Sequence, residues 1–112
     1  MDRTMLSRSL NGGYIEEYEF DMRRNLVTMH VDVLDNGVLT THDLRFEKVS
    51  HFAFDTESVG SQGDRLELTE LWVDTAPETS EFEEWSVTIS MWDMTHIGLR
   101  CSLITIDGNP IR

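Results

Sequence analysis

Three polar side chains, Glu17, His30 and Asp43, have the types and spacing with which this chain could do chemistry. The hydrophobic pattern around them predicts three neighbouring antiparallel strands, and the pairing that keeps apolar residues together places the three in one lateral row. A histidine between two carboxylates can bind a divalent metal ion or act as an oriented acid–base pair. The same row on a solvated strand face can also be an ordinary set of opposite charges, worth a few tenths of a kcal/mol. We favour this second interpretation, with metal binding as the alternative.

His42 is a second candidate, because the same pairing turns its side chain inward beside Val31. We expect a buried histidine that donates a hydrogen bond to a backbone carbonyl, with a ligand-binding role as the alternative. His51 starts a strand and His96 lies at a turn, and neither is predicted to bind a ligand. The sequence contains no H-E-x-x-H, C-x-x-C or EF-hand spacing, so we predict no cofactor.

The single cysteine, Cys101, excludes an intramolecular disulfide. It falls in the middle of a predicted strand and on its apolar face, where burial would raise the pKa of the thiol and hide it from solvent. We therefore assign it a structural role. The sequence also lacks a nucleophile elbow, a phosphate-binding loop and a dinucleotide-binding motif. These observations favour a protein that is not an enzyme.

The charge of the chain points to a different class of function. Its 112 residues carry a formal net charge of −12, from 21 Asp and Glu against 9 Lys and Arg. This balance argues against direct nucleic-acid binding, which needs clustered Lys and Arg facing phosphates. The excess is concentrated in one segment without Lys or Arg, which contains Glu67, Glu70, Asp74, Glu78, Glu81, Glu83 and Glu84. Acidic residues at this density can steer a basic protein partner, or they can serve solubility alone.

Two tryptophans add to this candidate binding surface. Trp72 lies on the opposite side of its predicted strand from Leu71 and Val73, and Trp92 lies opposite the apolar face of another strand. If the apolar faces form the core, both indoles point outward. Exposed tryptophan is a frequent anchor at protein interfaces. The alternative is that they cover a second layer or a contact between two copies of the chain.

The elements that must position these residues are strands, because most of the chain alternates apolar and polar residues with a period of two. Predicted strands cover residues 14–21, 26–34, 38–46, 50–55, 65–74, 85–92 and 96–104. In the predicted strand 65–74 the apolar residues change from even-numbered to odd-numbered positions, which predicts a β-bulge near Thr69–Glu70. Residues 1–13 are a poorly patterned lead-in, within which Thr4–Leu10 is a short helical candidate. The other short helical candidate is Thr79–Trp85.

Turns and loops predict how the strands align. Asn36-Gly37 is a strong signal for a two-residue hairpin turn, which pairs Val27 with Phe46. A four-residue loop between the first two strands likewise places their apolar residues opposite each other. A three-residue turn between the last two strands pairs Ile89 with Leu99. Strands with one apolar and one polar face are typical of antiparallel sheets.

We therefore predict an all-β fold with little helix, an antiparallel β-sandwich or flattened barrel of six to seven strands. A chain of this length favours a single domain over residues 1–112. No apolar run approaches the ~20 residues of a membrane-spanning helix. The N-terminus does not have the shape of a signal peptide, so we expect a cytoplasmic protein that does not bind membranes.

The strand rhythm resembles that of small bacterial YxiG-like domains and related immunity-protein families. The similar stretches are residues 14–21, 26–33, 44–52, which opens with Leu44-Arg45-Phe46, and the closing hairpin 85–106. The resemblance implies an all-β fold and a role in neutralising a toxin by binding it. It implies no catalytic residues.

The function predicted from these features is that of a non-enzymatic, acidic protein-interaction domain of a bacterial cell, of the kind that inhibits a basic toxin. The acidic segment 67–84 would face the partner, with Trp72 or Trp92 as apolar anchors. Two alternatives remain open. One is a β-barrel that binds a small ligand or a metal ion, and the other is a structural module that forms homo-oligomers.

Overall fold

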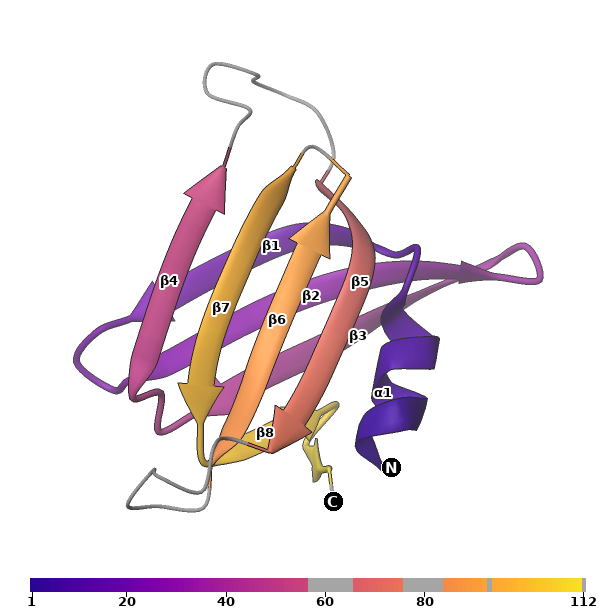
Figure 1. Cartoon of the computed structure of the whole chain (residues 1–112). Coiled ribbons are helices and arrows are strands. Elements are labelled where there is room, and N and C mark those ends of the chain that lie inside the picture. Colours follow the sequence, from indigo (N-terminus) through magenta and orange to yellow (C-terminus); the bar gives the residue numbers. More distant parts are fainter. Residues whose placement is uncertain (57–65, 76–83, 93, 112) are drawn as a thin grey trace.

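The structure is a computed structural model that describes residues 1–56, 66–75, 84–92 and 94–111 (Figure 1). One helix, α1 (Arg3–Leu10), precedes the strands, so the helical candidate in the lead-in is confirmed. The strands are β1 (Tyr14–Asp21), β2 (Leu26–Asp35), β3 (Val38–Glu47), β4 (His51–Thr56), β5 (Leu66–Thr75), β6 (Trp85–Met91), β7 (Thr95–Cys101), β8 (Leu103–Ile106) and β9 (Asn109–Pro110). The other helical candidate, Thr79–Trp85, lies almost wholly outside the described residues.

The strands form one open antiparallel sheet in the order β4-β7-β6-β5-β1-β2-β3-β8-β9. The predicted all-β class with little helix is therefore confirmed, with nine described strands instead of six to seven. The sheet bends sharply between β5 and β1, which pair at two positions, Tyr14 with Glu67 and Ile15 with Leu66. As a result β4, β7, β6 and β5 cross in front of β1, β2 and β3 in Figure 1. We call β4, β7, β6 and β5 the front half of the sheet, and β1, β2 and β3 the back half.

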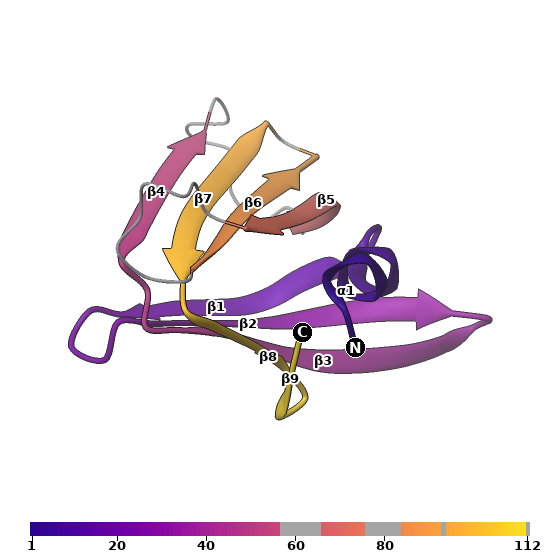
Figure 2. The same cartoon turned by 60° about the horizontal axis from the view of Figure 1, so that its bottom comes forward.

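The hydrophobic core lies between the two halves, which Figure 2 shows as separate layers. Phe46 and Leu44 of the back half and Leu99 and Ile89 of the front half are almost completely buried in one cluster. Helix α1 covers the end of the core beside β5 and β2 with the buried Leu6 and Leu10. The core is thus built from the alternate, inward-facing residues of both halves, as in orthogonally packed sheets.

The predicted alignment of the back half is confirmed. Val27 pairs with Phe46 across β2 and β3, and Phe20 pairs with Val27 across β1 and β2. The hairpin turn has positive φ at both Asn36 and Gly37, as a type I′ turn requires. These registers place Glu17, His30 and Asp43 side by side, as the sequence predicts.

The predicted alignment of β6 with β7 is wrong by two residues, because Ile89 pairs with Ile97 instead of Leu99. β6 ends at Met91 and β7 begins at Thr95, so the connection starts one residue earlier than a turn at residues 93–95 would. Trp92 N–H donates to the carbonyl of Glu67 on β5, and Met94 N–H donates to Met91 at a positive φ. The end of β6 therefore stays with β5. A shift of two residues keeps every side chain on its predicted face.

The predicted last strand, 96–104, is in fact two strands. The chain leaves the front half at Ser102, whose N–H donates to Glu47 O, and β8 then pairs with β3 in the back half. Alternation along a single strand would place Leu103 on the apolar face with Cys101, but this change of layer leaves it exposed. The predicted bulge in β5 is confirmed by a register shift between Leu68 and Glu70.

Candidate functional site

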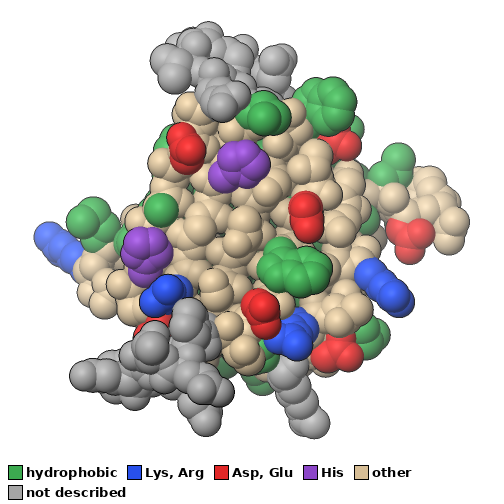
Figure 3. Space-filling view, in the orientation of Figure 1, with side chains coloured by type: hydrophobic (Ala, Val, Ile, Leu, Met, Phe, Trp, Pro, Cys, Tyr) green, Lys and Arg blue, Asp and Glu red, His purple; other side chains and the backbone are tan. Residues whose placement is uncertain are grey.

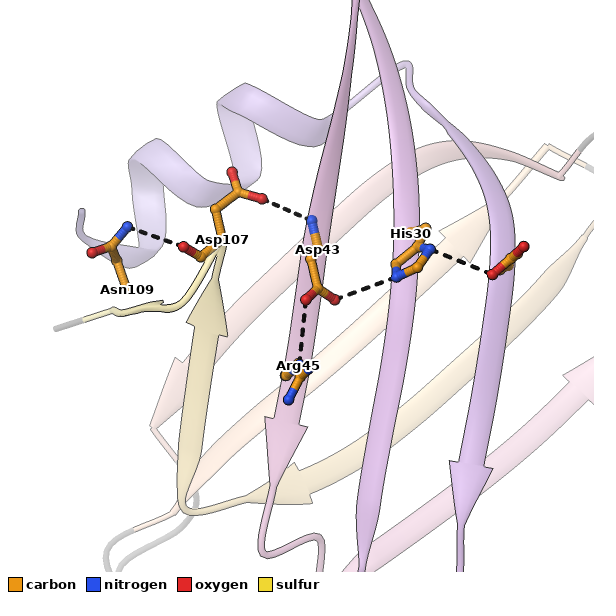
Figure 4. Close-up of polar contacts among 6 residues, drawn as sticks. His30, Asp43, Arg45, Asp107 and Asn109 are labelled. Carbon is orange, nitrogen blue, oxygen red and sulfur yellow. Dashed lines mark hydrogen bonds and ion pairs between the residues drawn. The ribbon is translucent and has the colours of Figure 1, made fainter.

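The predicted row on the back half has His30 at its centre. Its Nδ1 lies 3.4 Å from Glu17 Oε2 on β1, and its Nε2 lies 3.6 Å from Asp43 Oδ1 on β3. Figure 4 shows the imidazole of His30 with Asp43 at one ring nitrogen, and Glu17 contacts the other nitrogen. Arg45 Nε lies 3.3 Å from the other oxygen of Asp43. These side chains line a shallow depression of about 570 Å³.

This geometry favours the charge-row interpretation. A metal ion needs ligands that converge on one point, whereas Glu17 and Asp43 use different nitrogens of one ring. In the described part of the chain, no three His, Cys, Asp or Glu side chains are grouped so that they could hold a metal ion. The row joins β1, β2 and β3 through contacts between one imidazole and two carboxylates on a solvated face, which contribute little individually.

His42 faces inward from β3, as predicted, but it is only half-buried, and its partner is a carboxylate and not a backbone carbonyl. Its Nδ1 lies 2.7 Å from Asp107 Oδ2, and the other oxygen of Asp107 accepts from Asp43 N at 2.8 Å. Asp107 and Gly108 both have positive φ and form the tight turn between β8 and β9. The turn therefore holds the imidazole in one orientation.

The His42–Asp107 pair lies in a groove of about 990 Å³ between α1, the β2–β3 hairpin and the β8–β9 turn. Its apolar lining comes from Met1, Met5, Val33, Leu34, Ile106 and Pro110, and Arg8, Asn11 and Asn109 add polar groups. Concave sites with apolar walls and a few oriented polar groups are typical of small-ligand sites.

Asp107 also links the stability of the β8–β9 turn to pH. Partial burial on its own would raise the pKa of this carboxyl, but the N–H of Asp43 and the imidazole of His42 lower it below its ordinary value of 3.8. Since the folded chain favours the ionised form, the contribution of Asp107 to stability is present above pH 3.8. It is lost as pH falls through the lower, folded-state pKa.

We therefore expect Asp107→Asn to lower the melting temperature at about pH 7 and to lose this effect progressively below about pH 4. Thermal unfolding followed by circular dichroism across this range measures both quantities. Asp35→Asn in the β2–β3 turn makes the same change of charge at an exposed position and serves as the control. A constant difference between Asp107→Asn and the wild type at every pH would contradict the assignment.

The front half turns a flat surface outward, which Figure 3 shows. We call it the Trp72 face. Its outward-facing residues are His51, Ala53 and Asp55 of β4, His96, Gly98 and Arg100 of β7, Ser86, Thr88 and Ser90 of β6, and Glu70, Trp72 and Asp74 of β5. Trp72 is 58% exposed, so its predicted outward direction is confirmed. Glu70 and Asp74 lie on either side of it along β5.

The centre of the Trp72 face is made of small side chains. The strand registers align Ala53, Gly98, Thr88 and Trp72 in one row across all four strands. A Cβ atom added at Gly98 would meet no described atom within 4 Å. The surface above this residue is therefore open. Thr88 lies between Gly98 and the exposed indole of Trp72 in this row.

The other acidic residues of the predicted surface have different positions. Glu67 is half-buried and pairs with Tyr14, and Glu84 accepts a hydrogen bond from Ser50 Oγ at 2.6 Å. Asp74 Oδ1 lies 3.1 Å from Arg3 Nη1 of α1. The three remaining carboxylates, Glu78, Glu81 and Glu83, lie outside the described residues. Trp92, 76% exposed, follows the end of β6.

Sequence reasoning missed the partner of His42 and the small side chains beside Trp72. His42 and Asp107 are 65 residues apart, and no local pattern connects them. The alternation in Thr95–Cys101 does place His96, Gly98 and Arg100 on the polar face of β7, so that signal was present. Cys101 is completely buried, and this burial raises the pKa of its thiol to about 12, which agrees with a structural role.

Comparison with models of known protein families finds no match, and comparison with curated proteins finds none either. The resemblance to YxiG-like immunity domains therefore stays a prediction. The one helix that the structure describes is too short to cross a membrane.

Proposed function

We propose that this chain is a non-enzymatic protein-interaction domain of a bacterial cytoplasm that binds a basic protein through the Trp72 face. The observation that supports this proposal is the exposed indole of Trp72 between the carboxylates of Glu70 and Asp74, on one flat surface. Inhibition of a basic toxin is the role that fits such a surface best.

The chemistry of this arrangement suits lysine and arginine side chains. A cation placed over an indole gains about 0.5–2 kcal/mol, and nearby carboxylates add charge-assisted hydrogen bonds. Tryptophan is also among the residues that contribute most to binding when they are buried at an interface. The net charge of −12 would speed the approach of a basic partner at low salt.

The test is affinity capture from host cells with the wild type and with Trp72→Ala, at low and at high salt. We expect a basic protein to be enriched at low salt, and its affinity to fall about 30-fold or more in the variant, as for an interface hot spot. Leu39→Ser changes an equally exposed apolar residue of the β2–β3 hairpin and should bind normally. Equal capture by Trp72→Ala, or no basic protein at all, would contradict the proposal.

If the partner is a toxin, expressing it in cells should stop their growth, and co-expression of this domain should restore it. Co-expression with Trp72→Ala should fail to do so. Growth curves distinguish this role from binding without inhibition, because in that case the partner has no toxicity for the domain to relieve.

A second candidate function, small-ligand binding, rests on the groove that contains the oriented His42. With Nδ1 donating to Asp107, the neutral imidazole leaves Nε2 as a hydrogen-bond acceptor. Native mass spectrometry of untagged protein from its host should then show a bound small molecule, and His42→Ala should lose it. The mass of the bare chain in the wild-type sample would speak against this function.

A further inference from the structure

We propose that the free edge of β3 next to the β2–β3 turn, Val38–Thr41, binds an extended segment of a partner protein as an additional antiparallel strand. The segment that fits alternates apolar side chains with lysine or arginine. We call this stretch the β3 edge. It belongs to the back half of the sheet, whereas the Trp72 face belongs to the front half. The inference therefore goes beyond binding at the Trp72 face and does not depend on it.

The backbone of the β3 edge has donors and acceptors that no described strand uses. β3 pairs with β2 along its whole length, whereas β8 pairs only with Leu44–Glu47. Asp43 N–H donates to Asp107 Oδ1, and Asp43 O accepts from Asp107 N, so the backbone groups of Asp43 point to the β8 side. Alternate residues of a strand point these groups to the same side. The N–H and C=O groups of Leu39 and Thr41 therefore point away from β2, in the orientation that a further strand needs.

The β3 edge also lacks the features that usually keep a strand edge from pairing with another chain, namely charged side chains, proline and β-bulges. The edge of β1 beyond Ile15, which β5 leaves unpaired, has a bulge and several acidic side chains. Val38–Thr41 has none of these, and its Val38 and Leu39 are 65% and 64% exposed. Figure 2 shows the β2–β3 hairpin extending beyond the front half, which leaves this edge accessible in the described part of the chain.

The two faces of an added strand would meet different surroundings. In an antiparallel pair, a residue bonded to Leu39 or Thr41 turns its side chain to the outer face of the back half, and a residue opposite Thr40 turns inward. On the inner side lies the groove around His42 with its apolar walls. This groove would hold the apolar side chains of the segment, in place of the small molecule of the second candidate function. Strand addition elsewhere gains specificity from such pockets and affinity from main-chain hydrogen bonds.

The charges decide which side chains face outward. Asp32 of β2 and Asp43 of β3 lie on the outer face, and residues 25–44 contain no Lys or Arg. Asp43 contacts Arg45, which leaves Asp32 as the carboxylate without a described cation. On the inner side, Arg8 of α1 lines the groove. Basic side chains therefore fit the outer side and apolar side chains the inner side, as in a strand that alternates the two.

The test uses the full chain and a blocked peptide of roughly eight alternating Lys and Val residues, titrated to about 1 mM and followed by NMR. In the free chain, the amides of Leu39 and Thr41 should exchange rapidly with solvent, whereas those of Thr40 and His42, which face β2, should be protected. Saturation with the peptide should slow exchange at Leu39 and Thr41 about tenfold or more. The same peptide with Glu in place of Lys should not bind.

Matched variants of the peptide and of the chain test the geometry. The lysine N–H groups of the peptide would bond to β3 and the valine N–H groups would point away. N-methylation of the lysines should therefore abolish binding, and N-methylation of the valines should not. Leu39→Pro removes one donor at an edge that tolerates proline, and should weaken binding about tenfold. Leu39→Ser keeps the backbone donor and should bind like the wild type, as should Trp72→Ala.

Three results would overturn the proposal. One is the absence of protection at Leu39 and Thr41 at the highest peptide concentration. Another is binding that N-methylation of the lysines leaves intact, because the peptide would then not be an added strand. The third is slow exchange of both amides in the free chain, which would mean that a second copy or another segment already covers the edge. Capture of a basic partner that Trp72→Ala abolishes, or a small molecule in the groove, would survive each of these results, so they refute this inference alone.

Discussion

Replacing Phe46 with alanine is expected to destabilise the fold by about 3–5 kcal/mol, the usual cost of removing a fully buried phenylalanine. Phe46 is the largest of the completely buried side chains. It lies between Val27 of β2 and Ile104 of β8, on the inner face of the back half. Because the inner faces of both halves meet in one cluster, the cavity would open in the middle of the core.

Chemical denaturation followed by tryptophan fluorescence measures this loss, since domains of this size usually unfold in one transition. Phe54→Ala is the matched control. Phe54 is 59% exposed on β4, and we expect its loss to cost under about 1 kcal/mol. A loss below about 1 kcal/mol for Phe46→Ala would mean that the two halves do not share one core.

Replacing Gly13 with alanine is expected to destabilise the chain by about 1–3 kcal/mol, as overpacking does elsewhere. A Cβ atom at Gly13 would lie 2.9 Å from Asp32 O and 2.9 Å from Val31 Cγ1, closer than such atoms approach. The carbonyl of Gly13 also accepts from Leu68 N at 2.7 Å. Relief of the clash would therefore strain the connection of β1 to β5 at the bend of the sheet.

The control for this variant is Gly98→Ala, the same substitution at a position with free space. We expect it to raise stability by about 0.5–1 kcal/mol, because alanine loses less conformational entropy on folding. The two variants should thus change the midpoint of denaturation in opposite directions. Equal effects would show that backbone entropy, and not the close contact at Gly13, determines the result.

Local sequence signals predicted β1, β2 and β3 of the back half and the way they align. Asn36-Gly37 determines the turn type, and the turn type determines the register of β2 with β3. From that register follow the row around His30 and the inward direction of His42. The exposed position of Trp72 follows from alternation alone, because a strand with one buried face must turn its alternate residues outward.

The features that sequence reasoning missed depend on contacts between distant segments. At the end of β6, Trp92 N–H donates to the carbonyl of Glu67 on β5, a contact that the residues near the turn do not signal. The break at Ser102 likewise depends on Glu47. The pairing of β1 with β5 has no local signal, because it spans more than 50 residues at one bend.

The path of the chain between the two halves has a consequence for how the protein folds. The front half enters after Glu47 and ends before Leu103, so the back half is assembled from both ends of the chain. During synthesis, the edge of β3 at Leu44–Glu47 stays open until β8, some 60 residues later, has been made. Pairing over such a distance is slow, and an open apolar edge promotes aggregation. We therefore expect the back half to be completed only after β8 has been made, and premature termination within β7 to leave an insoluble product.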